Sequence, residues 1–130
     1  MKIHEAAENY LETILMLQRR NGTVRSSDIA RELGFSKPTV SEYMKGFRMD
    51  GYVTVDVDGH ISLSPSGLEI AERIYERHVV IAQFLMTLGV DEETAYADSC
   101  KIEHDISEKS FRCLQQEYLR RREKLAPSPD

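Results

Sequence analysis

The chain has 130 residues, of which 41% are hydrophobic and 30% are charged. This size allows one ordinary hydrophobic core or two small ones, and the composition is that of a folded helical protein rather than a disordered one. No apolar run reaches the roughly 18 residues that a membrane-spanning helix requires, and the N-terminus lacks the basic and apolar segments of a signal peptide. We therefore expect a cytoplasmic protein without a membrane partner, whose cysteines, Cys100 and Cys113, are thiols.

Charge is unevenly distributed along the chain. The net charge of −5 argues mildly against indiscriminate nucleic-acid binding. Residues 36–49, however, carry three basic side chains against one acidic one, whereas residues 61–130 carry 9 basic and 13 acidic side chains. The second half of the chain is therefore the less likely half to meet a nucleic acid.

The first two expected elements are helices. Residues 4–20 place their apolar side chains at helical spacing, and the Asn-Gly pair that follows is typical of a helix C-cap. A second helix is expected to begin at Ser26 or Ser27, either of which can cap it, and to stop at Gly34.

A third helix is expected from Ser36, its N-cap, with Lys37 and Pro38 in the first turn, where proline is tolerated. One side of this helix is apolar and the rest is polar. Two short helices joined through Gly34 fit a helix-turn-helix, with the second as the recognition helix.

A two-stranded ribbon is expected to follow. Alternating apolar residues at 53–57 and 61–63 predict two strands, and Asp58-Gly59 between them is a strong hairpin-turn signal. A ribbon directly after a recognition helix is typical of the wing of a winged helix. A similar hairpin without a role in DNA binding is the alternative.

The second half of the chain is expected to be entirely helical. A long helix over residues 66–88 carries His78 close to its apolar stripe, Asp91 caps another helix, and a last helix begins near Ser107. The predicted fold is thus mainly α, with a winged helix-turn-helix domain at 1–65 and a helical dimerisation domain at 66–130. These later helices are too few to enclose a core alone, so we expect a homodimer, whose two-fold symmetry suits a palindromic operator.

Cys100, Glu103 and His104 stand at positions i, i+3 and i+4 of the expected helix, so their side chains project from one side. Thiolate, carboxylate and imidazole are metal ligands. A buried cysteine beside a surface Glu-His pair would give the same pattern, and His78 taken alone fits a core histidine.

The segments AENYLETILML, SDIARELGFSKPTVSEYM, ERHVVIAQFLMTLGVDEETAY and CKIEHDIS resemble the diphtheria toxin repressor family. The likeness is greatest to its short, two-domain manganese transport regulators. The resemblance implies a metal site where the N-terminal helix meets the dimerisation domain. Its implied ligands are Asn9, Glu12, His78, Cys100, Glu103 and His104.

Two of these positions depart from the manganese type, which has an aspartate in place of Asn9 and a glutamate in place of Cys100. The iron type resembles this chain at 100, 103 and 104 but has a methionine at position 9. The iron type's ancillary-site ligands correspond to Ala82 and Tyr96, so that site is expected to be absent. A thiolate favours iron, cobalt or zinc over manganese, whereas the two glutamates suit manganese or iron. We expect Fe²⁺ or Mn²⁺, with Co²⁺ or Zn²⁺ as possible ions.

The resemblance implies a metal-dependent transcriptional regulator, commonly a repressor, of metal-homeostasis genes that binds double-stranded operator DNA as a homodimer. By resemblance, positions 36, 38 and 42 face base edges or thymine methyl groups. Glu42 either reads cytosine or merely pairs with Lys45, and His60 is expected at a phosphate near the wing tip. The expected DNA contacts are Arg25, Ser36, Lys37, Pro38, Thr39, Ser41, Glu42, Lys45, Arg48 and His60.

Two other functions compete with this one. A winged-helix regulator that no longer depends on metal is favoured by the neutral Asn9. A small metalloenzyme would use Glu103 as general base beside metal-bound His104. The enzyme is disfavoured because the sequence has no second histidine at suitable local spacing, no nucleophile elbow and no phosphate loop.

Overall fold

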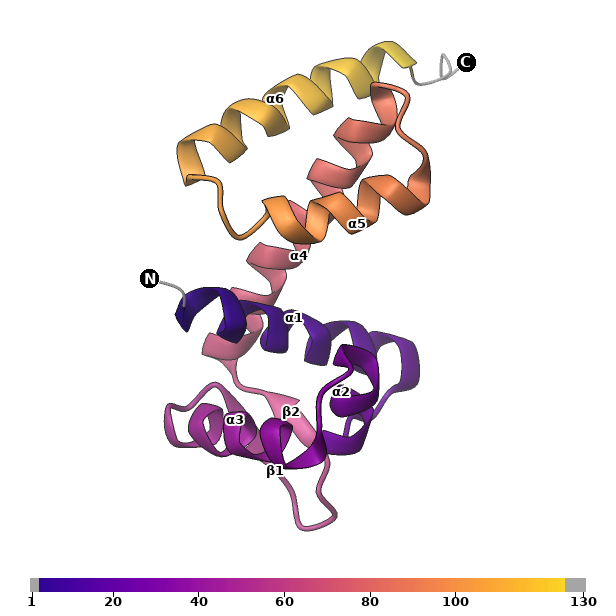
Figure 1. The fold of residues 1–130 in the computed structure, drawn as a ribbon. Coiled ribbons are helices and arrows are strands. Elements are labelled where there is room, and N and C mark those ends of the chain that lie inside the picture. The colour runs from indigo at the N-terminus through magenta and orange to yellow at the C-terminus, as the bar shows by residue number, and fades with distance from the viewer. Residues whose placement is uncertain (1–2, 126–130) are drawn as a thin grey trace. The chain divides into compact units, whose positions relative to one another are not determined.

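The computed structural model describes residues 3–125, which form two compact units that divide after Arg73. The described residues confirm the mainly helical fold with a two-stranded wing (Figure 1). No helix among them is long and apolar enough to cross a membrane. In chain order the elements are α1 (Ile3–Asn21), α2 (Ser26–Leu33), α3 (Lys37–Met49), β1 (Val53–Val55), β2 (Ile61–Leu63), α4 (Pro65–Thr87), α5 (Glu92–Ile102) and α6 (Glu108–Leu125).

The first unit is a winged helix. Helix α1 packs on α2 and β2, while α3 packs on α2 and β1. The apolar stripes predicted from helical spacing all turn inward here, because burying them is the main favourable term in folding. Its fully buried side chains include Leu11, Ile14, Ile29, Val40 and Val53.

The helix-turn-helix forms where it was predicted, with one correction. Gly34 ends α2 in the left-handed region at φ 73°, and Ser36 caps α3 by accepting a hydrogen bond from the Thr39 amide at 3.3 Å. The prediction that Ser26 or Ser27 caps α2 is wrong, because the N-cap residue is Arg25. The Asp28 carboxylate accepts from the Arg25 amide at 2.9 Å and so satisfies this helix end.

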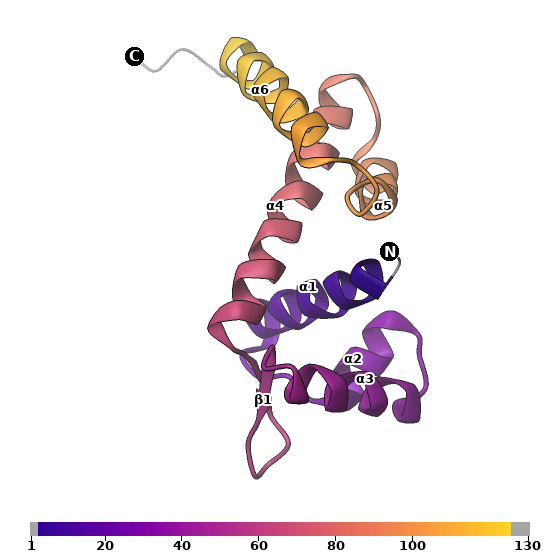
Figure 2. The same ribbon diagram turned by 90° about the vertical axis from the view of Figure 1, so that its left-hand side faces the viewer.

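The wing is shorter than predicted. Val55 of β1 lies opposite Ile61 of β2, which leaves residues 56–60 as the connection rather than a two-residue turn. The Asp56 carboxylate accepts hydrogen bonds from two amides of this loop, those of Asp58 and His60, each at 2.9 Å. This local bonding replaces the strand pairing, so Val57 leaves the strand and is fully exposed. Figure 2 shows the loop projecting from the side of the unit opposite α1.

The second unit contains the C-terminal part of α4 together with α5 and α6. Asp91 caps α5, as predicted, by accepting from the Thr94 amide at 3.0 Å. The guanidinium of Arg121 on α6 lies 5.3 Å from the ring of Phe84 on α4. The core side chains of this unit include Ile74, Ile81, Ala82, Ala95 and Phe111.

Candidate functional site

Four of the predicted metal ligands meet in the second unit. The Nδ1 atom of His78, on α4, lies 2.8 Å from Oε2 of Glu103 and 3.7 Å from the sulfur of Cys100, on α5. His104 Nε2 lies 3.3 Å from the other carboxylate oxygen of Glu103, Oε1. The imidazole of His78 therefore contacts a thiol and a carboxylate, and the same carboxylate also contacts the imidazole of His104.

The chain places these groups together because helical geometry continues just past α5. The helix ends at Ile102, yet the Glu103 amide still bonds to the Ser99 carbonyl at 3.0 Å and its backbone stays in the right-handed helical region. Cys100 and Glu103 therefore share a side, as predicted. The prediction that the helix also includes His104 is wrong, because that residue lies in the turn that follows.

Ser99 is a member of the cluster that sequence reasoning missed. Its hydroxyl is fully buried, donates to the His78 carbonyl oxygen at 2.5 Å and lies 3.3 Å from His78 Nδ1. The only signal in the sequence is its position four residues before Glu103, on the same side of α5. Ser99 fixes both the backbone and the ring of His78.

Burial gives the Glu103–His78 pair its electrostatic character. Glu103 is 0% exposed and His78 is 7% exposed, so an unpaired charge on either would be costly. Burial opposes a charge on His78, but hydrogen bonds to Cys100 and Glu103 outweigh it and raise the pKa of His78 to about 10. The contacts with Cys100 and Glu103 therefore favour the protonated form of His78 in metal-free protein.

The cluster fits a divalent cation. Oε1 of Glu103 is buried and makes no hydrogen bond among the described residues, although His104 Nε2 lies 3.3 Å from it, so its lone pairs can serve a cation. Imidazole must be neutral to ligate a metal, so a bound cation would take the place of the His78 proton. Thiolate, carboxylate and imidazole are all ligands of first-row transition metals.

The remaining predicted ligands belong to α1 in the first unit. Glu12 is buried and Asn9 is partly buried. The main-chain carbonyl oxygen of Asn9 accepts a hydrogen bond from the Thr13 hydroxyl at 2.8 Å. The two side chains lie three residues apart and so share one face of α1.

The predicted ancillary position carries different chemistry. Ala82 is buried, and the Tyr96 hydroxyl accepts a hydrogen bond from Gln83 at 3.0 Å. The Tyr96 ring lies 5.3 Å from the His78 ring and therefore covers that side of the imidazole.

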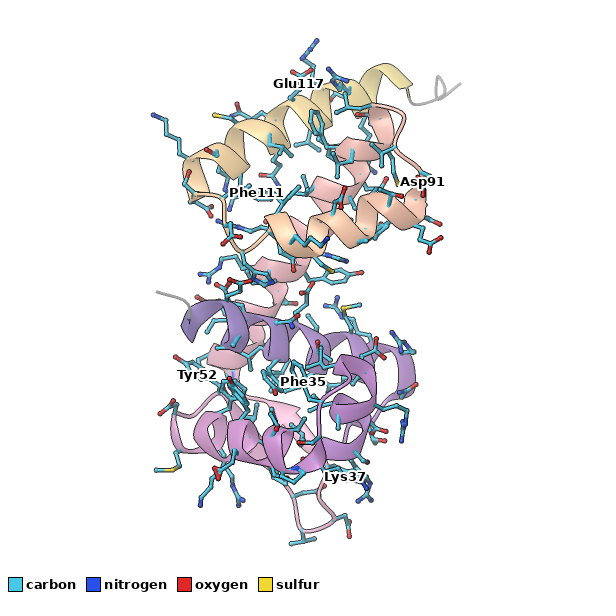
Figure 3. All side chains as sticks on the ribbon, in the orientation of Figure 1. Phe35, Lys37, Tyr52, Asp91, Phe111 and Glu117 are labelled. Carbon is cyan, nitrogen blue, oxygen red and sulfur yellow. The ribbon has the colours of Figure 1, made fainter. Side chains whose placement is uncertain are left out.

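The predicted DNA contacts on α3 and its N-cap form one accessible face. Figure 3 shows Lys37 on the side of the first unit from which the wing projects. Arg25 is tied to the wing, because its guanidinium donates to the Asp58 carbonyl at 2.5 Å, and His60 lies 3.4 Å from the Asp56 carboxylate. The exposed members of the face are Ser36, Lys37, Pro38, Thr39, Ser41, Glu42, Lys45 and Arg48.

A hollow of about 180 Å³ opens on the first unit between α2, α3 and β1. Its polar lining consists of two serine hydroxyls and two cations, and no acidic side chain lines it. Ser26, at the start of α2, was not among the predicted DNA contacts, because its role as a possible helix cap was the only signal in the sequence. The lining residues are Ser26, Ser41, Met44, Lys45, Arg48 and Val55.

Comparison with known families accounts for both units. Residues 2–61 match the family described as "Iron dependent repressor, N-terminal DNA binding domain". Residues 64–124 match the family described as "Iron dependent repressor, metal binding and dimerisation domain".

Individual proteins match over most of the chain. The "HTH-type transcriptional regulator MntR" of Lysinibacillus sphaericus is 35% identical over 104 residues, which cover 80% of this chain and 75% of that protein. The protein of the same name from Bacillus pumilus is 37% identical over 104 residues, covering 80% of this chain and 72% of the relative. The solved structure of "the manganese regulator SloR" aligns with a TM-score of 0.73 at 27% identity, covering 85% of this chain but 52% of that one. The chain thus spans about half the length of that solved structure.

Proposed function

Because the chain belongs to the iron-dependent repressor family of transcriptional regulators, we propose that it binds operator DNA as a homodimer when a divalent transition metal is bound. The family consists of DNA-binding regulators and not of enzymes. The observation that carries the proposal is the cluster around the buried His78–Glu103 pair, in a chain whose other unit is a winged helix. The domain matches support residues 1–65 as the DNA-binding domain and residues 66–130 as the dimerisation and metal-binding domain.

The proposed ligand set draws on both units. A bound cation supplies positive charge that the ligand carboxylates can share. Glu12 would hold it from α1, and Glu103 with its neighbours would hold it from the second unit, so that the DNA-binding unit is tied to the dimerisation unit. The full proposed set is Asn9, Glu12, His78, Cys100, Glu103 and His104.

The donor set supports Fe²⁺ or Mn²⁺ as the ion. Cys100 offers a soft thiolate, which favours iron, cobalt or zinc, whereas Glu12 and Glu103 offer hard oxygen ligands suited to manganese or iron. The family description names iron and the SloR structure is that of a manganese regulator. Co²⁺ and Zn²⁺ suit the same ligands and serve as probes.

The exposed face of α3 supports DNA as the partner. Positions 36, 38 and 42 are proposed to contact base edges or methyl groups in the major groove, and the cations beside them to contact phosphates. A homodimer places two such helices about 34 Å, or a multiple of it, apart on a palindromic operator. We propose repression of metal-homeostasis genes in the cytoplasm. The proposed phosphate contacts are Arg25, Lys37, Lys45, Arg48 and His60, and the hollow adds Ser26.

The test measures operator binding with and without added ions. Duplexes selected from a random-sequence pool, with and without metal, are titrated with wild type, Glu103→Gln and the control Glu93→Ala in Fe²⁺, Mn²⁺, Co²⁺ or Zn²⁺. Glu93 is an exposed residue at the start of α5, so its loss leaves the cluster intact. We expect an ion to strengthen DNA binding by wild type and Glu93→Ala but not by Glu103→Gln, which retains the shape of the side chain.

The same titration separates the two candidate functions. If no ion strengthens binding, or if Glu103→Gln responds like wild type, the metal switch is wrong. Strong binding by wild type without any ion would favour the regulator that does not depend on metal, for which the neutral Asn9 is the motivating feature.

A further inference from the structure

Arg77 immediately precedes His78 on α4, and its side chain is 11% exposed. One of its terminal nitrogens, Nη1, donates to the carbonyl oxygens of Glu103 at 3.1 Å and Ile106 at 3.0 Å. The other, Nη2, donates to the carboxylate of Glu108 at 2.7 Å. The guanidinium therefore joins the end of α5 to the first turn of α6.

These contacts lie where the backbone most needs partners. The last carbonyl groups of a helix have no partner within it, and a cation near that end is favoured by the helix dipole. The Glu103 carbonyl belongs to the C-cap residue of α5, the Ile106 carbonyl lies in the connection to α6, and one planar guanidinium bonds to both. A lysine presents a compact ammonium and cannot reproduce this fork.

Two consecutive residues of α4 thus hold Glu103 at both ends. His78 contacts the side-chain carboxylate at 2.8 Å, and Arg77 contacts the main-chain carbonyl of the same residue. His104 is the next residue along, within the stretch that Arg77 closes at Ile106. The backbone that carries two of the proposed ligands is therefore fixed by a side chain that is not itself a ligand.

We propose that Arg77 is the positioning residue of the metal cluster, because it sets the conformation of residues 103–106. This inference rests on the proposed function, in which Glu103 and His104 hold the cation. Groups that orient metal ligands from outside the coordination sphere contribute about 10- to 100-fold to metal affinity. Loss of Arg77 is therefore expected to weaken metal binding although every ligand remains.

Arg112 on α6 provides a matched control. It bonds to the same carboxylate, Glu108, at 2.7 Å, and its guanidinium lies 5.5 Å from the ring of Phe111, over which Arg77 also lies, at 5.2 Å. Among the described contacts, Arg112 makes none with the carbonyls of residues 103–106. A substitution at Arg112 removes its contacts with Glu108 and Phe111. The bonds from Arg77 to the carbonyls of Glu103 and Ile106 remain.

The experiment compares Arg77→Met, Arg77→Lys and Arg112→Met in the full chain. Co²⁺ affinity is followed through the thiolate-to-cobalt absorption band, and amide hydrogen exchange of residues 103–105 is measured in metal-free protein. We expect Arg77→Met to raise the Kd for Co²⁺ about 10- to 100-fold and to speed exchange about tenfold. Arg77→Lys is expected to lie closer to Arg77→Met than to wild type, and Arg112→Met within about threefold of wild type.

Equal shifts in Arg77→Met and Arg112→Met, or full retention of wild-type affinity by Arg77→Lys, would overturn the positioning role. Circular dichroism checks that each variant folds. If Arg77→Met does not fold, the Co²⁺ affinity of Arg77→Lys decides whether Arg77 is a positioning residue. Absence of Co²⁺ binding by the wild type would refute the proposed function rather than this contact. The exchange rates then decide on Arg77 alone, and equal rates in Arg77→Met and Arg112→Met would refute the inference.

Discussion

The two cations that line the hollow beside α3 are predicted to account for a large part of the salt dependence of DNA binding. Lys45 and Arg48 line it together with two serine hydroxyls and no acidic group. Both cations are exposed on a helix proposed to lie on DNA, so each is placed to neutralise one phosphate. The informative perturbation is the double substitution Lys45→Gln/Arg48→Gln, which removes both charges while keeping side chains of substantial length.

The size of the effect follows from counterion release. Each phosphate contact contributes about 0.9 to the slope of log affinity against log salt concentration, so the four contacts of a homodimer contribute about 3.6. When salt is raised fourfold, from about 50 to 200 mM, both proteins should lose affinity for DNA. The fold loss of the wild type should be about 150 times the fold loss of the double variant. Loss of these contacts weakens binding to all sequences alike, because phosphates carry no sequence information.

Fluorescence anisotropy of a labelled operator duplex across a salt series, with metal saturating, measures this slope. The control is Lys101→Gln/Arg122→Gln, which changes the net charge equally but alters exposed residues of the second unit. We expect the control slope to match the wild type. If the two double variants have the same slope, the hollow is not a phosphate site and the reasoning from its lining is refuted.

Three further predictions concern stability. Tyr10 has a buried hydroxyl without a hydrogen bond among the described residues, so Tyr10→Phe should raise the free energy of unfolding by about 0.5–1 kcal/mol in urea titrations; a loss of stability would show that the hydroxyl is satisfied. A Cβ at Gly67 would overlap the Tyr52 carbonyl oxygen, whereas one at Gly46 meets open space. In thermal unfolding, Gly67→Ala should therefore lower the free energy of unfolding by more than about 2 kcal/mol, and Gly46→Ala should raise it by about 0.5–1 kcal/mol. Burial lowers the pKa of His78, but its hydrogen bonds outweigh this effect and raise the pKa to about 10, so the metal-free native state holds a proton between pH 6.5 and 10 that the unfolded state has lost. The free energy of unfolding of wild type, relative to that of His78→Asn, should therefore fall as pH rises, by at most about 1.4 kcal/mol per pH unit. If the free energies of unfolding of the two proteins change in parallel with pH, this prediction is wrong.

The parts predicted correctly from the sequence are those determined by neighbours in the chain. Ser36 caps α3, and Gly34 turns the chain before it, because both signals act within four residues. The spacing of Cys100 and Glu103 likewise predicts correctly that their side chains lie on one side of the helix. Helical periodicity specifies which residues share a face, and this holds even where the last residue of the helix is not predicted.

The parts that escaped prediction depend on a competing side chain or on distant contacts. Asp28 rather than a serine satisfies the start of α2, and Asp56 replaces the expected tight turn by bonding to the amides of its own loop. Ser99 and Arg77 act on residues more than 20 positions away in the sequence. A helical pattern shows that Arg77 lies beside the apolar stripe, but not that its guanidinium meets two carbonyls of a turn.

The division of the proposed ligands between the units implies a division of their roles. In the second unit Glu103 is held before any ion binds, since His78 and Arg77 fix its two ends, and preorganised ligands lose little freedom on binding. Ligands on the DNA-binding unit can make metal affinity depend directly on DNA, because coupling requires a differential interaction with the two states. Of the two proposed ligands on the DNA-binding unit, Asn9 is neutral, so Glu12 is the charged one.

Glu12→Gln is therefore expected to remove most of the coupling while leaving much of the metal affinity, whereas Glu103→Gln removes both. The measurement is the Co²⁺ dissociation constant with and without saturating operator duplex. In wild type the ratio of these constants must equal the factor by which Co²⁺ strengthens operator binding, because linkage is reciprocal. A Glu12→Gln protein whose ratio stays at the wild-type value would show that the link between the units does not run through α1.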